Sequence, residues 1–159
     1  MKKLKLFIHV SNSQKYTTAE VDDDLLISQL IKENSQAGIS EEVDAYLEDQ
    51  EEGLDKKITV SKADLKNGDH VFLGRCKKVS VSINYAGKSF PLSVSPATSM
   101  KKLKKEALKY FGIDEVSGAD LLLWYNNEPL DMRQIIGSLT EFPTCSVSLV
   151  LATKNDVNG

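Results

Sequence analysis

Residues 79–94, VSVSINYAGKSFPLSV, contain two runs in which apolar and polar residues alternate, separated by Ala86, Gly87 and Lys88. Alternation with a period of two is typical of a strand that buries one face. Two such runs around a short glycine-containing turn predict a β-hairpin. Pro96 ends the second strand, so the stretch predicts two adjacent antiparallel strands.

A helix is predicted directly after this hairpin. Thr98 or Ser99 can cap its N-terminus, and Gly112 stands at its C-terminal end. The apolar stripe that would face the sheet consists of Met100, Leu103, Ala107, Tyr110 and Phe111.

The remainder of the second half returns to strand patterns. We expect a strand at residues 121–125, a turn at 126–129, a short strand at Leu130, a helical turn at Ile135 and Ile136, and a last strand at 147–151.

The first half repeats this order 75 residues earlier, since Leu4 begins it as Val79 begins the second. It predicts a hairpin over residues 4–21, a helix over 26–34 and strands at 43–47, 58–60 and 70–73. The acidic residues Asp22, Asp23 and Asp24 are candidate N-caps of that helix, and Gly38 can end it.

The repeat therefore predicts an α+β protein of two tandem domains, each a sheet packed across one helix. The predicted boundaries are residues 1–75, residues 76–152 and a flexible C-terminal tail at residues 153–159. The short connection at residues 75–78 is poor in glycine and serine, so it limits the orientations that the two domains can adopt.

The second half resembles the ubiquitin superfamily and its β-grasp fold. Residues 85–94 are similar to the ubiquitin hairpin, 123–130 to its third strand and following turn, and 147–151 to its last strand. The first half is less similar because its loop at 49–57 departs from the pattern. The tandem arrangement resembles the interferon-induced tandem modifier of vertebrates and the bacterial modifiers of Bil-type antiphage operons, of which we favour the bacterial kind.

This resemblance implies a protein modifier without catalytic residues or a cofactor of its own. An activating enzyme would adenylate the C-terminal carboxylate of Gly159, and a conjugating enzyme would transfer it to a target lysine. A deconjugating protease would be a further partner, and phage structural proteins are one class of target. The tail that would reach these enzymes consists of Lys154, Asn155, Asp156, Val157 and Asn158.

The C-terminus also departs from the family. The usual ending is a pair of glycines after an arginine, whereas Asn158 precedes a single glycine here. Two alternatives therefore stay open. One is a non-covalent adaptor that binds partners through its two sheet faces, and the other is a sulfur carrier that forms a C-terminal thiocarboxylate.

A partner-binding patch is predicted on the second domain. If residues 147, 149 and 151 face the helix, Val150 faces solvent together with Trp124, and Tyr85 lies near both. Exposed aromatic residues often anchor protein interfaces. The alternative is that Trp124 packs against the first domain. The lysines of the second helix are interpreted as a solvated face.

Composition excludes several other classes of function. Residues 1–75 carry ten basic and fifteen acidic residues, and residues 76–159 carry ten and eight, which does not favour nucleic acid as a partner. His9 and His70 have no metal-ligand spacing, and no apolar run is long enough to span a membrane. Cys76 and Cys145 do not form a disulfide framework, and Cys76 is interpreted as a linker residue without chemistry. We expect a cytoplasmic protein.

Overall fold

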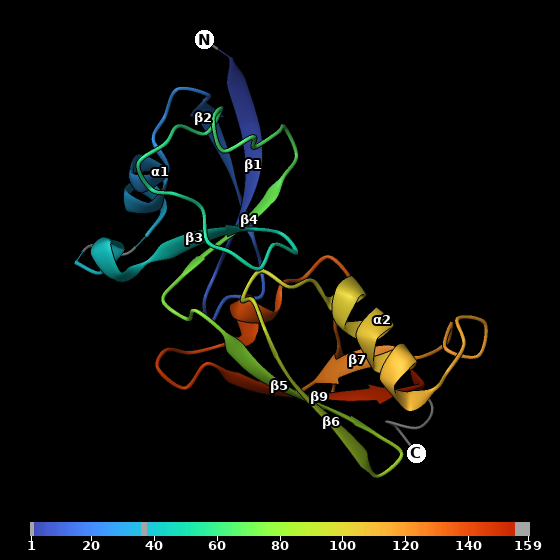
Figure 1. The fold of residues 1–159 in the computed structure, drawn as a ribbon. Coiled ribbons are helices and arrows are strands. Elements are labelled where there is room, and N and C mark those ends of the chain that lie inside the picture. The colour runs from blue at the N-terminus through green and yellow to red at the C-terminus, as the bar shows by residue number, and fades with distance from the viewer. Residues whose placement is uncertain (1, 36–37, 155–159) are drawn as a thin grey trace.

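The computed structural model describes residues 2–35 and 38–154 (Figure 1). No helix in these two ranges is long and apolar enough to cross a membrane. The elements are β1 (Lys3–Val10), β2 (Thr17–Asp22), α1 (Ile27–Asn34), η1 (Ser40–Glu42), β3 (Asp44–Leu47), β4 (His70–Gly74), β5 (Val79–Tyr85), β6 (Lys88–Val94), α2 (Met100–Phe111), β7 (Leu122–Tyr125), β8 (Glu128–Pro129), η2 (Ile136–Leu139) and β9 (Ser146–Ala152).

The first sheet has four strands in the order β2-β1-β4-β3. Its two central strands are parallel, with Ile8 opposite Val71, and the outer strands pair with them antiparallel. Residues of even number in β1 point to α1, and Leu6, Leu30 and Ile31 are almost fully buried in the core between sheet and helix.

The second sheet repeats this arrangement with one more strand, in the order β6-β5-β9-β7-β8. Its parallel central pair is β5 and β9, with Ile83 opposite Leu149, and α2 covers one face. Both units are β-grasp domains, so the predicted tandem α+β fold is confirmed. The predicted inward side of β9 is also confirmed, because Val147, Leu149 and Leu151 are buried.

The ends of α2 agree with the sequence pattern. The hydroxyl of Ser99 accepts a hydrogen bond from the backbone N–H of Lys102 (3.2 Å), and Gly112 adopts a left-handed conformation with φ of 71°. Gly112 can adopt this conformation at little cost because it has no Cβ.

The predicted acidic cap of α1 is wrong. The helix begins only at Ile27, its N-cap is Leu26, and its first turn contains no acidic residue. The side chain of Gln29 accepts the hydrogen bond of the Leu26 backbone N–H (3.0 Å) instead. Asp22 still belongs to β2, so the acidic run lies before the helix and not at its N-terminus.

Residues 58–60 form no strand, contrary to the prediction. Thr59 forms only an isolated bridge, with Leu26, outside the named strands. The Ile58 carbonyl accepts from the Ile27 N–H, and the Val60 N–H donates to the Leu25 carbonyl. This segment therefore extends the entry to α1, and its buried Val60 closes the end of the core.

The apolar stripe of α2 is also partly different from the prediction. Tyr110 is 56% exposed, and Leu108 is buried in its place. Position 110 lies three residues after Ala107 and seven after Leu103, on the same side of the helix, but it belongs to the last turn, where the Tyr110 ring stacks on Phe90 and not in the core.

Candidate functional site

The C-terminal exit of the second domain follows directly from β9, which ends at Ala152. The indole N–H of Trp124 donates to the Ala152 carbonyl (3.0 Å), and Lys154 is exposed. The proposed conjugation residue Gly159 lies outside the described residues, as do the predicted tail residues Asn155, Asp156, Val157 and Asn158.

The predicted patch of Tyr85, Trp124 and Val150 does not form. Val150 is 43% exposed on the outer face of the sheet, as predicted, and Trp124 lies directly opposite it in the register of β7 and β9. The Trp124 side chain is nevertheless only 5% exposed, so the prediction that it is an exposed anchor is wrong.

Tyr85 lies on the other side of the sheet. It has the same parity in β5 as the buried Ile83, and its ring contacts Phe111 at the end of α2, with 5.2 Å between ring centroids. Because side chains alternate along a strand, Tyr85 faces the helix and not Val150.

The outer face of the second sheet is instead rich in hydroxyl groups. A shallow hollow on it is lined by serines of β5 and β9 around Pro91 of the edge strand β6. The serines are Ser80, Ser82, Ser146 and Ser148. This face is exposed but offers few apolar groups besides Val150.

Part of the outer face of the first sheet, along β3 and β4, is covered by the second domain. Phe72 of β4 and Tyr46 of β3 point away from α1 and pack against Ala97 and Ile135 of the second domain. All four are at most 5% exposed. We call these four residues the domain seam, and Figure 1 shows η2 of the second domain beneath the first sheet at this place.

Two glycines make room for the Phe72 ring in the seam. A Cβ on Gly137 of η2 would lie 2.5 Å from the ring and 2.7 Å from the Pro96 carbonyl oxygen. A Cβ on Gly74 would meet the same ring from the first domain. The ring therefore fits only because both positions lack a side chain.

Hydrogen bonds join the two domains around the seam. The Ser13 N–H donates to the Ser138 carbonyl (3.0 Å), and the Asp49 N–H donates to the Ala97 carbonyl (2.9 Å). The Asp49 carboxylate also accepts from the backbone N–H (2.8 Å) and the hydroxyl (3.1 Å) of Ser99. Since Ser99 is the N-cap of α2, a residue of the first domain supports the start of the second domain's helix.

Replacing Asp49 with glycine is expected to lower the free energy of unfolding by about 1–2 kcal/mol, the usual effect of losing a capping interaction. Glycine suits this position because Asp49 has φ of 61°, so the substitution removes the carboxylate without backbone strain. Denaturant unfolding measures the change. Asp120, which is exposed, provides the matched control, and an equal loss in Asp120→Gly would refute the role of Asp49.

A histidine pair lies on the same face of the first sheet. His9 is 1% exposed, and its Nε2 lies 2.8 Å from Nδ1 of His70. Burial, and second the charge of His70, lower the pKa of His9 to about 4. Burial and then Arg133 of the second domain lower the pKa of His70, whereas Asp69 raises it. Both rings are therefore neutral at neutral pH.

Stability is expected to fall as the pH drops from about 6.5 to about 4. In this range the unfolded chain binds a proton at His9 and the folded chain does not, so acid favours unfolding, by about 3 kcal/mol for the full shift. Unfolding curves across this range measure the effect. In His9→Gln the free energy of unfolding should depend much less on pH. If the pH dependence is unchanged in that variant, it arises from other titratable groups.

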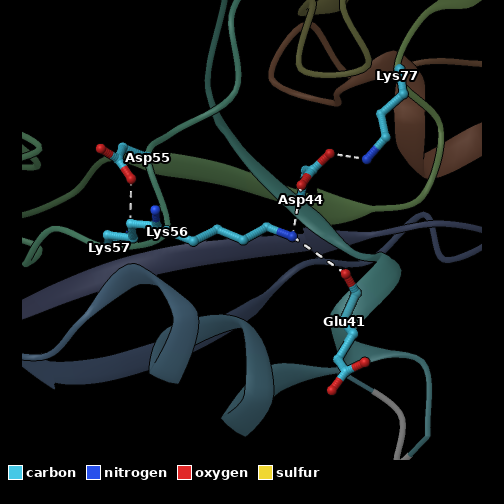
Figure 2. A network of polar contacts seen from close by, with 6 residues as sticks. All are labelled: Glu41, Asp44, Asp55, Lys56, Lys57 and Lys77. Atoms are coloured by element: carbon cyan, nitrogen blue, oxygen red, sulfur yellow. Dashed lines mark hydrogen bonds and ion pairs between the residues drawn. The ribbon is translucent and has the colours of Figure 1, made fainter.

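Ion pairs hold the connection between the domains. Figure 2 shows Asp44 of β3 between two lysines: it pairs with Lys56 (2.9 Å) of its own domain and with Lys77 of the connection. The Lys56 ammonium also donates to the Glu41 carbonyl (3.5 Å). Such partly exposed pairs add little stability, but they orient the connection.

A disulfide joins Cys76 of the connection to Cys145, which lies just before β9. The prediction that Cys76 has no chemistry is therefore wrong. The parallel pairing of β5 and β9 explains the approach, because the Ser80 N–H donates to the Cys145 carbonyl (3.0 Å) and so brings the two segments together. The two cysteines are separated by 69 positions in the sequence, so no local pattern indicated this contact.

Groups of histidine, cysteine, aspartate and glutamate that could hold a metal ion do not occur among residues 2–35 and 38–154.

Comparisons with known proteins agree with this description. Residues 80–154 match the family described as BilA ubiquitin-like domain 2. No curated protein matches the chain.

Similar solved structures include the ubiquitin of Caldiarchaeum subterraneum, which is 18% identical with a TM-score of 0.41 and covers 48% of this chain and 92% of its own. A ubiquitin-like domain from Arabidopsis thaliana is 15% identical with a TM-score of 0.37, covering 46% of this chain and 77% of its own.

Proposed function

Because the chain is a tandem ubiquitin-like protein whose residues 80–154 match a domain of the Bil type, we propose that it is a protein modifier that is joined to target lysines through Gly159. The observation that carries this proposal is the family match of the domain that precedes the C-terminus. By the same resemblance, the setting is bacterial antiphage defence in the cytoplasm, with phage structural proteins among the targets.

The arrangement of the two domains supports the use of one terminus. The last strand of the first domain ends at Gly74 and leads through Arg75 and the disulfide-linked Cys76 into β5. The last strand of the second domain leads to the exposed Lys154 and the C-terminal residues. The first exit therefore offers no carboxylate to an activating enzyme, because the chain continues from it into β5.

The chemistry needs no catalytic group from this chain. The carboxylate of Gly159 attacks the α-phosphate of ATP and releases pyrophosphate. A cysteine thiol of the activating enzyme then displaces AMP, and a lysine amine finally displaces the thiol to form an amide bond. Glycine suits the reacting position because it has no side chain to crowd the attack.

The direct test is incubation with a cognate activating enzyme, ATP and magnesium. A thioester adduct that disappears on treatment with a thiol is expected, and it should not form when Gly159 is deleted. The proposal fails if no adduct forms with enzyme that is active on ATP, or if the adduct survives the deletion.

A non-covalent adaptor is the second candidate, and the exposed outer face of the second sheet with Val150 favours it. On the first sheet, the domain seam covers the outer side of β3 and β4. An adaptor would retain its partners after deletion of residues 155–159 and lose them in Val150→Asp. A modifier would no longer be joined to its targets after the same deletion.

A further inference from the structure

An asparagine-glycine pair, Asn67 and Gly68, forms the middle of the turn that leads into β4, and both residues are exposed. In such a pair the backbone nitrogen of the glycine can attack the side-chain amide of the asparagine. Glycine favours this reaction because it has no Cβ that crowds the attacking nitrogen. Asn67 is thus a position at which the chain can modify itself without an enzyme.

The shape of the turn keeps the attacking nitrogen away from the side chain. The Asp69 N–H donates to the Lys66 carbonyl (3.1 Å), which closes a four-residue turn. Gly68 has φ of 91° and Asn67 has a negative φ, as in a type II turn. The ψ angle of the first central residue in such a turn is about +120°. Ring closure needs ψ of the opposite sign, at which the Gly68 nitrogen faces the Asn67 side chain.

Both reacting groups are also bound by Lys5 of β1. The Lys5 backbone N–H donates to Oδ1 of Asn67 (2.8 Å), and the Gly68 N–H donates to the Lys5 carbonyl (2.7 Å). We call these two hydrogen bonds the Lys5 clamp. The attack requires the Gly68 nitrogen to lose its proton and the Asn67 amide to rotate toward it, and each of these steps breaks one bond of the clamp.

The Lys5 clamp depends on the fold of the first domain. Lys5 and Asn67 are 62 positions apart in the sequence. They meet because β1 and β4 pair in parallel, and the Phe7 N–H continues this contact by donating to the Asp69 carbonyl (2.9 Å). The clamp is lost when β1 separates from β4. A reaction that proceeds only from this open form has a rate set by the population of the open form.

We infer that Asn67 is a self-modification site that the folded first domain closes and that unfolding opens. In the open form the Gly68 nitrogen bonds to Cγ of Asn67, and a five-membered succinimide ring results. The side-chain NH2 group takes up the proton of the Gly68 nitrogen and leaves as ammonia. Water then opens the ring. Addition of water at the Cγ carbonyl gives aspartate, and addition at the backbone carbonyl gives isoaspartate.

The isoaspartate form does not fit the native turn. Its backbone runs through Cβ and Cγ, so one more atom separates Cα of residue 67 from the Gly68 nitrogen. The clamp requires the side chain of residue 67 and the Gly68 N–H to reach the same residue, Lys5, and the additional atom shifts one against the other. A chain that has opened thus keeps a chemical mark in its first domain, irrespective of conjugation through Gly159.

The test measures conversion of Asn67 in the full chain in mildly alkaline buffer, with and without urea. Digestion with trypsin at mildly acidic pH stops the reaction and releases residue 67 in peptides that end at Arg75. Asn67 has the only amide side chain in residues 63–75, so a change of mass in these peptides reports on it alone. The asparagine-glycine pair at 158–159 falls in a different peptide. A synthetic peptide of residues 63–70 controls for the effect of urea on the chemistry.

Conversion of the full chain should be slower in buffer than in urea by about tenfold or more, whereas the synthetic peptide should react at the same rate in both solutions. The Gly68 amide of the folded chain should also exchange its hydrogen with solvent more slowly than in the peptide, because it is bound to the Lys5 carbonyl. Equal conversion of the folded and unfolded chain would overturn the inference. So would an unfolded chain that does not convert, or a Gly68 amide that exchanges as fast as in the peptide.

Discussion

Replacing Phe72 with alanine is expected to lower the free energy of unfolding by about 3–5 kcal/mol, the range for truncating a buried phenylalanine. The ring is fully buried between the first sheet and the second domain, and Gly74 and Gly137 leave no side chain that could fill the space. The cavity would therefore remain open. Denaturant unfolding measures the loss, and the two domains should also begin to unfold in separate steps.

The seam can also be tested by adding one methyl group on the second domain. Gly137→Ala should destabilise the chain because the added Cβ meets the Phe72 ring and the Pro96 carbonyl. Gly53→Ala is the matched control, since its Cβ would make ordinary contacts of 3.6 Å. Equal effects of the two substitutions would show that the seam is not tightly packed.

Reduction of the disulfide between Cys76 and Cys145 is expected to cost about 4 kcal/mol of stability. The bond closes a loop of 69 residues, and loops of this length lose much conformational freedom in the unfolded state. Unfolding with and without a reducing agent measures the difference, and the double variant Cys76→Ser, Cys145→Ser should not respond to the reducing agent.

The state of this bond in the cell is open to direct measurement. Disulfides persist mainly in oxidising compartments. The bond requires both cysteines to be oxidised, whereas a cytoplasmic location favours two free thiols. Alkylation of the protein on lysis, followed by intact mass, separates the forms. Two alkylated thiols would mean that the protein works without the bond, whereas none would speak against the cytoplasmic expectation.

The features that the sequence predicted well depend on local or periodic patterns. The hairpin around Gly87, the N-cap at Ser99 and the C-terminal glycine at 112 each follow from a few neighbouring residues. The repeat of strand and helix patterns at an interval of 75 residues then indicated the tandem fold, because both halves share the order strand, strand, helix, strand and final strand, to which the second half adds β8.

The features that it did not predict depend on contacts between distant residues. Trp124 has the expected outward parity, but its burial and its bond to Ala152 depend on what surrounds it in space. Phe72 alternates with the core residues Val71 and Leu73 in a continuous apolar run. A strand that is apolar on both faces is typically buried on both sides. The apolar run in β4 could therefore have indicated that the outer face of this strand is covered.

The seam also limits what the first domain can do. In this arrangement its outer sheet face contacts the second domain and supports the N-cap of α2 through Asp49. The seam residues Tyr46 and Phe72 are thus not accessible to other proteins.

The most direct test of this account is a nuclear Overhauser measurement on the full chain between the ring protons of Phe72 and the Hα protons of Gly137. The structure predicts strong cross-peaks, because a Cβ at Gly137 would lie within 2.6 Å of two ring carbons. Absence of these cross-peaks, with the intradomain contacts of Phe72 still present, would mean that the two domains do not share this seam.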